Sequence, residues 1–434
     1  MLTQLIRLIS GLNTVRGTIN MNNLTKQLTL KYSLLQSTYW ISQCIIGGFA
    51  AVFLRSKNFS NTEIGFVLSS ALVLSIILQL LIANFADKTK KVTLRTIVIA
   101  LMFFVVTLIL IMYIAPSSFL LIAVNFCLVS AIQSTLNPLL NSLAVEYINK
   151  GFNVNYGLSR GMGSISFALT SYLFGMYVTN FSINTLLLVF LFFYCFVIIS
   201  TFAFKIKIPA QYLSSPQLIK DKKINESEEK LTVAPSGIIA FFKKYKNFSL
   251  QLIGIAMLFY SHNIICTYLI NIIENVGGNS TDMGISLAIT ATVELPTMAA
   301  FIFLIRKIRC NTLIKISSFF FLVKAAILWL APNVYIVHLS QAMQMFAYAL
   351  FTPASVYYVN SIIEEQDKVK GQSMLGVAMC IAGTVANISG GKILDTLGVT
   401  DMLFLGTIAT ACGFIIICFS TNKNVESKCI VAEL

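Results

Sequence analysis

Residues 60–85 read SNTEIGFVLSSALVLSIILQLLIANF, a polar hexapeptide followed by an unbroken apolar run. The run from 65 to 85 has about the 20 residues that a helix needs to cross a bilayer. The hexapeptide suits a helix start, because a hydroxyl or amide residue can cap the helix and Glu63 places an acid in its first turn. The stretch therefore predicts a membrane helix with a marked beginning.

The composition extends this prediction to the whole chain. Of the 434 residues, 57% are hydrophobic and only 11% are charged, whereas about a quarter of a soluble chain is charged. The apolar runs lack the alternation of barrel strands, and helices are the other structure that satisfies its backbone in lipid. We therefore predict an all-α protein whose main partner is the lipid bilayer.

Twelve apolar runs of suitable length follow one another along the chain. They lie near residues 29–54, 65–85, 96–115, 118–147, 156–179, 183–204, 247–273, 283–305, 312–331, 334–362, 371–393 and 400–420. The first twenty residues contain no continuous apolar stretch, so no cleaved signal is evident. The sequence thus predicts twelve transmembrane helices.

The loops between these runs alternate in charge. Lys and Arg gather after the second, fourth, sixth, eighth and tenth runs, while the alternate loops hold only Arg55, Lys57 and Lys392. Basic loops stay on the cytoplasmic side, so we expect both termini in the cytoplasm and the protein in the cytoplasmic (inner) membrane. The net charge of +14 is then an orientation signal, and we expect no nucleic-acid partner.

The chain also repeats itself across its middle. Asn279–Gly284, NSTDMG, opens the eighth run as the first hexapeptide opens the second. Two further pairs are shifted by about the same 215 residues: Asn137-Pro138 with Thr352-Pro353, and Gly157-Leu158-Ser159 with Gly371-Gln372-Ser373. We expect two six-helix pseudo-repeats joined by a polar linker. The predicted segments are a cytoplasmic N-terminal segment 1–28, bundles 29–205 and 247–420, a cytoplasmic linker 206–246 and a cytoplasmic tail 421–434.

Arg160 is the charge that the apolar sequence explains least. It lies in YGLSRGMGSISFA at residues 156–168, and a charge inside the bilayer usually faces a cavity or a partner. Phe167 falls on the same helix face two turns later. A guanidinium fork beside an aromatic ring suits a hydroxyl-rich ring as ligand. The alternative is a structural ion pair near the cytoplasmic face.

Glu294 and Lys324 are the other two charges deep inside predicted spans. Glu294 lies two residues before Pro296, and Lys324 lies in the next run, so antiparallel neighbours can bring them together. A buried acid beside a cation can exchange a proton with changing conformation, although a purely structural pair is the alternative. His262 and Gln344 are neutral polar groups at similar depth, suited equally to ligand contact or to packing hydrogen bonds.

Other classes of site find little support. The nine cysteines are scattered and the two histidines lie far apart, which predicts neither a metal site nor a disulfide framework. We find no G-x-x-x-x-G-K-[ST] nucleotide loop and no nucleophile–base set. We therefore expect no cofactor and no enzyme activity.

These residues carry a resemblance to the major facilitator superfamily, and within it to the lactose-permease-like oligosaccharide or nucleoside:proton symporters. Residues 83–91, ANFADKTKK, resemble the signature loop that governs conformational change, on Asp87, Lys88 and Lys91, though its glycines are missing. The family's sugar-binding arginine falls on Arg160 and its stacking tryptophan on Phe167.

Further positions follow from the same resemblance. The acidic sugar ligand falls on Asn141, the eighth-helix glutamate on Glu294 and the ninth-helix arginine on Lys324. In the tenth helix the coupling histidine falls on Gln344 and the proton-carrying glutamate on Ala347, while His262 matches a seventh-helix histidine of wider relatives. Asn141 argues against lactose itself, and Ala347 leaves Glu294 as the best remaining proton carrier.

The sequence thus predicts a monomeric secondary active transporter that works by alternating access. Its expected partners are a small polar solute, sugar- or nucleoside-like, and protons. The expected binding residues are Arg160, Asn141, Phe167, His262 and Gln344, with Glu294 and Lys324 in coupling. The alternatives are a drug-type exporter of the same superfamily and a membrane sensor on this fold that does not transport.

Overall fold

Every regular element in the computed structural model is a helix within the described residues, which are 2–88, 92–115, 118–149, 152, 154–181, 183–205 and 237–421. The first half of the chain contains α1 (Leu2–Gln43), η1 (Cys44–Gly48), α2 (Ala50–Ser56), α3 (Asn61–Lys88), α4 (Leu94–Ile114), α5 (Phe119–Ile148), α6 (Tyr156–Asn180), η2 (Ile183–Thr185) and α7 (Leu186–Ala203).

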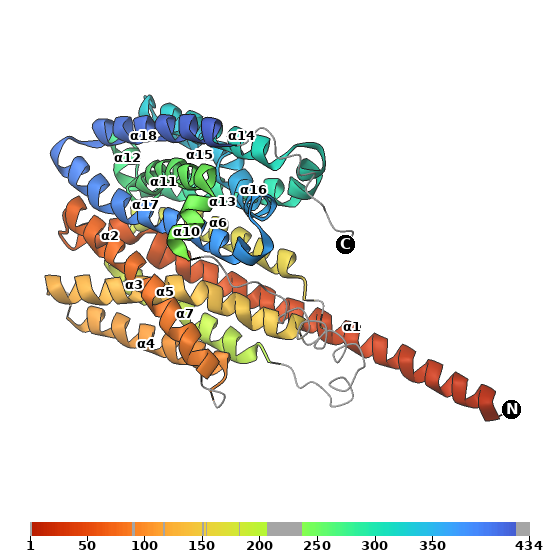
Figure 1. Cartoon of the computed structure of the whole chain (residues 1–434). Helices are drawn as coiled ribbons and strands as arrows, with labels where there is room; N and C mark the ends of the chain where they lie inside the picture. The colour runs from red at the N-terminus through yellow and green to blue at the C-terminus, as the bar shows by residue number, and fades with distance from the viewer. Residues whose placement is uncertain are drawn as a thin grey trace.

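The second half contains α10 (Ile238–Lys244), α11 (Lys246–Thr267), α12 (Leu269–Asn275), α13 (Ser280–Lys307), α14 (Cys310–Trp329), α15 (Val334–Ala342), η3 (Met343–Met345), α16 (Tyr348–Ile362), η4 (Glu365–Asp367), α17 (Lys368–Thr396) and α18 (Val399–Ser420). Figure 1 shows the two halves as two groups of helices lying side by side, with the start of α1 and the end of α18 toward the same end.

The membrane helices match the predicted spans closely. Among the described residues ten helices are long and apolar enough to cross a bilayer, and 23–48 with 50–56, bent by 45°, make an eleventh. The predicted fifth span is α6, which is 25 residues long and packs between α1 and α13. It is long enough but less apolar than the other ten helices, because serines, glycines and Arg160 replace aliphatic residues along it.

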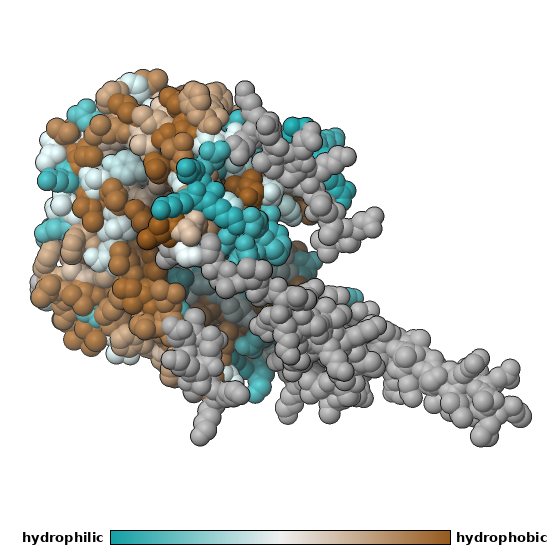
Figure 2. All heavy atoms as spheres, viewed as in Figure 1, coloured by the Kyte–Doolittle hydropathy of each residue, from teal (hydrophilic) through white to brown (hydrophobic). Residues whose placement is uncertain are grey.

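The outer surface of the bundle is apolar, as lipid contact requires. Large side chains such as Phe192, Phe303 and Phe419 are more than half exposed. In Figure 2 hydrophobic residues spread over both groups of helices, while hydrophilic residues gather near α10. The chain is therefore a multi-pass membrane protein.

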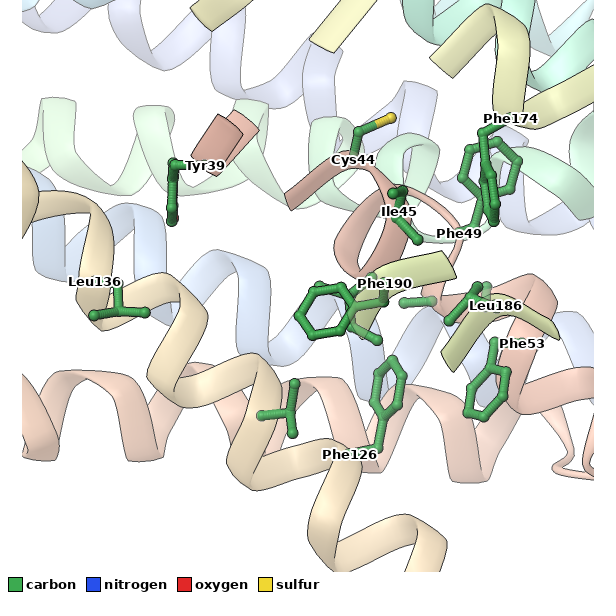
Figure 3. Packing of buried hydrophobic residues seen from close by; sticks show 14 of the residues in the cluster. Tyr39, Cys44, Ile45, Phe49, Phe53, Phe126, Leu136, Phe174, Leu186 and Phe190 are labelled. Carbon is green, nitrogen blue, oxygen red and sulfur yellow. The ribbon is translucent and has the colours of Figure 1, made fainter. Parts of the chain in front are cut away.

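The bend in the first span is a π-helical turn, η1, which widens the helix at Cys44–Gly48. Aromatic packing holds the bend in place (Figure 3). The Phe49 ring meets Phe174 of α6 edge-on at 4.9 Å, and Phe53 stacks on Phe126 of α5 at 5.6 Å. Single wide turns of this kind are frequent at functional sites.

Both hexapeptides form the helix starts that their sequences predict. The Glu63 carboxylate accepts from the backbone and hydroxyl of Ser60, while the Ser60 hydroxyl accepts from the Glu63 N–H. Asn279 and Asp282 form the same reciprocal capping box at α13. Two donors at each helix start are thereby satisfied.

The two halves meet closely at the end of the bundle opposite the termini, which we call the sealed end. There the Asp395 carboxylate of α17 accepts from the backbone and side chain of both Asn61 and Thr62, which begin α3. Arg55 forms an ion pair with Glu274 at 2.5 Å. These bonds join the first half to the second.

Glycines make this approach possible at two helix crossings. A Cβ on Gly65 of α3 would overlap the carbonyl oxygen of Asn387 on α17, and one on Gly391 of α17 would overlap that of Asn61. At the α6–α13 crossing, Gly175 and Gly284 occupy equivalent places, with Gly284 against the Ser171 backbone. Gly65 and Gly284 each end one of the repeated hexapeptides.

We expect Gly65→Leu to separate the halves at the sealed end, because its side chain has no space against the Asn387 backbone. In a background without native cysteines, cross-linking between cysteines placed at Arg55 and Glu274 should fall several-fold. Gly376→Leu is the matched control, since a Cβ there meets nothing within 4 Å. Equal cross-linking yields in all three proteins would contradict the proposed role of Gly65.

Candidate functional site

Arg160 lies one turn into α6 and stacks on an aromatic ring of α1. Its Cζ atom is 4.1 Å from the centroid of the Trp40 ring, and Nη1 donates to the Ser164 hydroxyl at 3.2 Å. Phe167, the aromatic residue predicted from sequence, meets the same Trp40 edge-on at 6.0 Å. The structure therefore brings Arg160 and Phe167 together around Trp40.

Asn141 joins this group through hydrogen bonds. Its Oδ1 accepts from the Gln36 amide at 3.1 Å and from the Tyr32 hydroxyl at 3.0 Å. The Gln36 Oε1 in turn accepts from the Trp40 indole at 3.1 Å. This chain fixes the plane of the Trp40 ring, so Asn141 positions the surface on which Arg160 lies.

Glu294, Gln344 and Lys324 form a second group in the other half. The Lys324 amine, on a side chain only 2% exposed, donates to the Gln344 Oε1 at 2.6 Å. The Gln344 Nε2 donates to the Glu294 Oε1 at 3.2 Å. The expected direct approach of Glu294 and Lys324 is thus replaced by an amide bridge, which contacts both charges at once.

Local backbone breaks place these three side chains. Gln344 lies in η3, the short 3-10 turn that separates α15 from α16, and Pro296 interrupts the hydrogen bonds of α13 just after Glu294. Ala347, where the resemblance expects a glutamate, is fully buried, and its carbonyl oxygen accepts from Ser317.

His262 belongs to an aromatic cluster on the same side. Its ring stacks on Tyr348 with centroids 5.1 Å apart and meets the edges of Phe259 and Phe321. The Cys266 thiol, one turn further along α11, lies 3.7 Å from its Nε2. Stacking rather than a charged partner therefore defines the surroundings of His262.

The two groups face each other across the boundary between the halves. Helices α6 and α13, which carry Arg160 and Glu294, make the most extensive helix contact in the molecule. A Cβ on Gly161 would lie 3.9 Å from Leu295, and the positive charges of Lys324 and Arg160 both act on Glu294. A ligand between the halves can therefore reach a cation, an acid and an aromatic face.

The signature-like loop lies apart from this region. Asp87 and Lys88 are the last two residues of α3, and Lys91 falls outside the described residues. Most of the predicted linker (206–236) and nearly all of the predicted tail (422–434) also fall outside them. Among the described side chains, no group of three or more His, Cys, Asp and Glu residues could hold a metal ion.

Sequence reasoning missed Trp40, Gln36 and Tyr348. Gln36, Trp40 and Gln43 recur at intervals of four and three residues in the first predicted span, which places them on one helix face. That spacing was the available signal in α1. Tyr348 carried no comparable signal, because it is one of four tyrosines in its predicted span and their spacing does not single it out.

Comparison with known proteins agrees with this arrangement. The model of the MFS_1 like family matches residues 32–404. The chain belongs to this family. This MFS protein is 23% identical over 385 residues to a protein described as maltose permease from Geobacillus stearothermophilus, covering 86% of this chain and 90% of that one. It is also 24% identical over 364 residues to the uncharacterized transporter YwbF of Bacillus subtilis (strain 168), covering 83% and 85%.

Solved structures share the fold of this MFS protein. The nucleoside transporter NupG superposes with a TM-score of 0.68 at 16% identity, covering 92% of this chain and 98% of that one. A D-xylose-proton symporter superposes with a TM-score of 0.61 at 13% identity, covering 90% and 96%. The family match and the two curated relatives make this protein an MFS transporter and not an enzyme.

We expect Gln344→Leu to lower the unfolding temperature of the purified protein by several degrees. The substitution leaves the buried Lys324 amine without its partner, and an unsatisfied buried donor costs about 1–3 kcal/mol or more. Lys324→Met should restore much of the loss in the double variant. Gln341→Leu is the control, since the Gln341 amide bonds a neutral hydroxyl, that of Thr290. An unchanged unfolding temperature would show that Gln344 does not stabilise the lysine.

Proposed function

We propose that this protein is a secondary active transporter, acting as a monomer, that moves a small polar solute together with protons. The solute is sugar- or nucleoside-like. The observation that carries the proposal is that two groups lie opposite each other. In one half Arg160 stacks on Trp40, and in the other half hydrogen bonds link Glu294, Gln344 and Lys324. Solutes of MFS proteins bind between the halves near the bilayer midplane, where these groups face each other.

Arg160, Trp40 and Phe167 supply the solute-binding chemistry on one side. A guanidinium can donate two parallel hydrogen bonds to neighbouring hydroxyls, and the aromatic rings pack against the apolar face of a sugar ring. Asn141 holds the arrangement through Gln36, while His262 with Tyr348 offers a second aromatic surface. The similar proteins described as a maltose permease, a nucleoside transporter and a D-xylose-proton symporter support such a solute class.

Glu294 is the proposed proton carrier. The residue is half-buried, and its carboxylate contacts the Gln344 amide and lies in the fields of Lys324 and Arg160. A change in the distance to either cation alters the stability of the charged carboxylate. Movement of the halves can therefore be linked to uptake and release of a proton.

The structure fits one stage of alternating access. The sealed end carries the polar and glycine contacts that join α3 to α17 and α6 to α13. From the bias of basic loops we expect the other end, with both termini, to lie in the cytoplasm of the cell. We therefore propose an inward-facing state, in which bundles 29–205 and 247–420 move against each other about the central site.

We expect Arg160→Lys to abolish solute binding in a protein that still folds. A lysine ammonium cannot donate two parallel hydrogen bonds to neighbouring hydroxyls, and it lacks the planar group that stacks on Trp40. Binding is measured by thermal shift against a panel of neutral sugars and nucleosides. Phe167→Ala should weaken binding more than Phe167→Trp. Arg55→Lys, which changes a cation at the sealed end, is the control. Normal affinity in Arg160→Lys would make Arg160 a structural residue.

We expect Glu294→Gln to retain exchange of solute across proteoliposome membranes and to lose accumulation driven by a pH gradient. The amide mimics a permanently protonated carboxyl, so the cycle continues without carrying protons. Glu146 is an exposed acid near the C-terminal end of α5. The control variant Glu146→Gln should therefore accumulate solute as the wild type does. Uphill accumulation by Glu294→Gln would assign the proton to another group.

A further inference from the structure

A basic pocket lies where α10 meets α11, at the end of the bundle opposite the sealed end. Its volume is about 350 Å³, within the range of small-molecule sites. Lys243, Lys244 and Lys246 line it, in the region where hydrophilic residues gather near α10 in Figure 2. The rest of its wall consists of Tyr245, Asn247, Phe248, Tyr358 and Ile362. None of the residues assigned above to solute binding or coupling lines this pocket.

The acids beside the pocket do not neutralise all of its lysines. Residues 364–367 contain three acids, and each is paired with a lysine. The pairs are Lys244 with Glu364 at 2.7 Å, Lys370 with Asp367 at 3.8 Å, and Lys368 with Glu365. Lys243 and Lys246 are exposed and form no ion pair with any described residue. Two positive charges therefore remain at the pocket for an anion.

The start of α11 adds to this preference for an anion. Helix α11 has 22 residues, and no side chain caps it at Tyr245. The N–H groups of a first helical turn carry partial positive charge, and the first turn of α11, residues 246–248, lines the pocket. A helix start beside two lysines is a combination that suits a phosphate group.

A buried amide close to the pocket lacks a partner. Gln251 lies one turn after Asn247 in α11 and is fully buried. Neither its Oε1 nor its Nε2 makes a hydrogen bond with a described residue. The hydroxyl of Tyr358, which lines the pocket, lies beside this amide. Buried polar groups are nearly always satisfied in native proteins, so Gln251 and Tyr358 point to a ligand that accepts hydrogen bonds.

Exposed apolar side chains surround the pocket on its own helices. Ile239 and Phe242 of α10 are 74% and 38% exposed, and Leu250, one turn into α11, is 44% exposed. Apolar residues beside lysines are typical of a helix that lies at the surface of a membrane. A basic pocket at that depth attracts the headgroups of anionic lipids. A soluble phosphate ester would leave these apolar side chains unused.

We propose that this pocket binds the phosphate group of an anionic phospholipid. Lys243, Lys246 and the start of α11 hold the phosphate, while the acyl chains contact the exposed apolar residues beside it. The inference goes beyond the proposed function, because it involves neither the solute nor the proton. Since Tyr358 belongs to α16, a bound headgroup also joins α10 and α11 to that helix.

The test uses purified full-length protein in detergent, with binding measured by thermal shift. The probes are dioleoyl phosphatidylglycerol, dioleoyl phosphatidylcholine, which has the same chains without net charge, and glycerol phosphate, which has the charge without chains. We expect phosphatidylglycerol to stabilise the wild type far more than the other two. The double variant Lys243→Gln with Lys246→Gln should bind phosphatidylglycerol about thirtyfold more weakly.

The matched control is Arg306→Gln with Lys307→Gln. It removes the same charge from exposed residues at the end of α13, outside the pocket, and should bind phosphatidylglycerol as the wild type does. Gln251→Leu changes no charge and should weaken binding several-fold through the lost amide. Lys243→Arg with Lys246→Arg should retain binding, so the test stands even if the glutamine double variant does not fold.

Equal losses in the pocket variant and the α13 variant would show a general attraction to basic residues and would overturn the inference. Equal stabilisation by phosphatidylcholine would exclude recognition of the anionic headgroup. Equal stabilisation by glycerol phosphate would make the ligand a soluble phosphate ester and would overturn the lipid assignment. Because every probe is a lipid or its headgroup, each of these results leaves the proposed transport function untouched.

Discussion

The backbones of the two halves approach each other closely where Gly65 and Gly391 meet the opposite helix, and again where Gly175 meets Gly284. The relation between the two halves depends on these two crossings. The α6–α13 crossing sets the rotation of both helices, and so determines that Arg160 and Glu294 face a common space. The α3–α17 crossing closes one end of that space. A bulkier residue at either crossing would increase the distance between the halves, and would therefore also move the side chains that face each other across their boundary.

Within that space, low dielectric decides how the charges are arranged. A buried lysine needs a partner, and Lys324 finds one in an amide that is itself bonded to Glu294. An amide bridge tolerates either charge state of the acid, because its oxygen serves the lysine and its nitrogen serves the glutamate. On the other side, the Trp40 ring face stabilises the Arg160 guanidinium without neutralising it. Neither cation therefore forms a direct ion pair with Glu294 among the described residues.

Much of the fold could be predicted from the sequence because its signals are local. Run length predicted the membrane helices, and the hexapeptides predicted capping at α3 and α13, which the hydrogen bonds confirm. The rare charges of apolar spans drew attention to Arg160, Glu294 and Lys324. Trp40 was missed although its spacing with Gln36 and Gln43 in α1 was an available signal, whereas Tyr348 has no pattern until the helices are packed. The bridge through Gln344 likewise depends on the 3-10 turn of η3, which the sequence did not predict.

Asp395 accepts four hydrogen bonds from two consecutive residues of α3, and all four cross the boundary between the halves. Because one carboxylate accepts them, moving the Asp395 side chain away from α3 removes all four together. Their loss also returns the exposed N–H groups at the start of α3 to water. Separating α17 from α3 would therefore break all four bonds, so Asp395 contributes to the cost of that separation beside the Arg55–Glu274 ion pair.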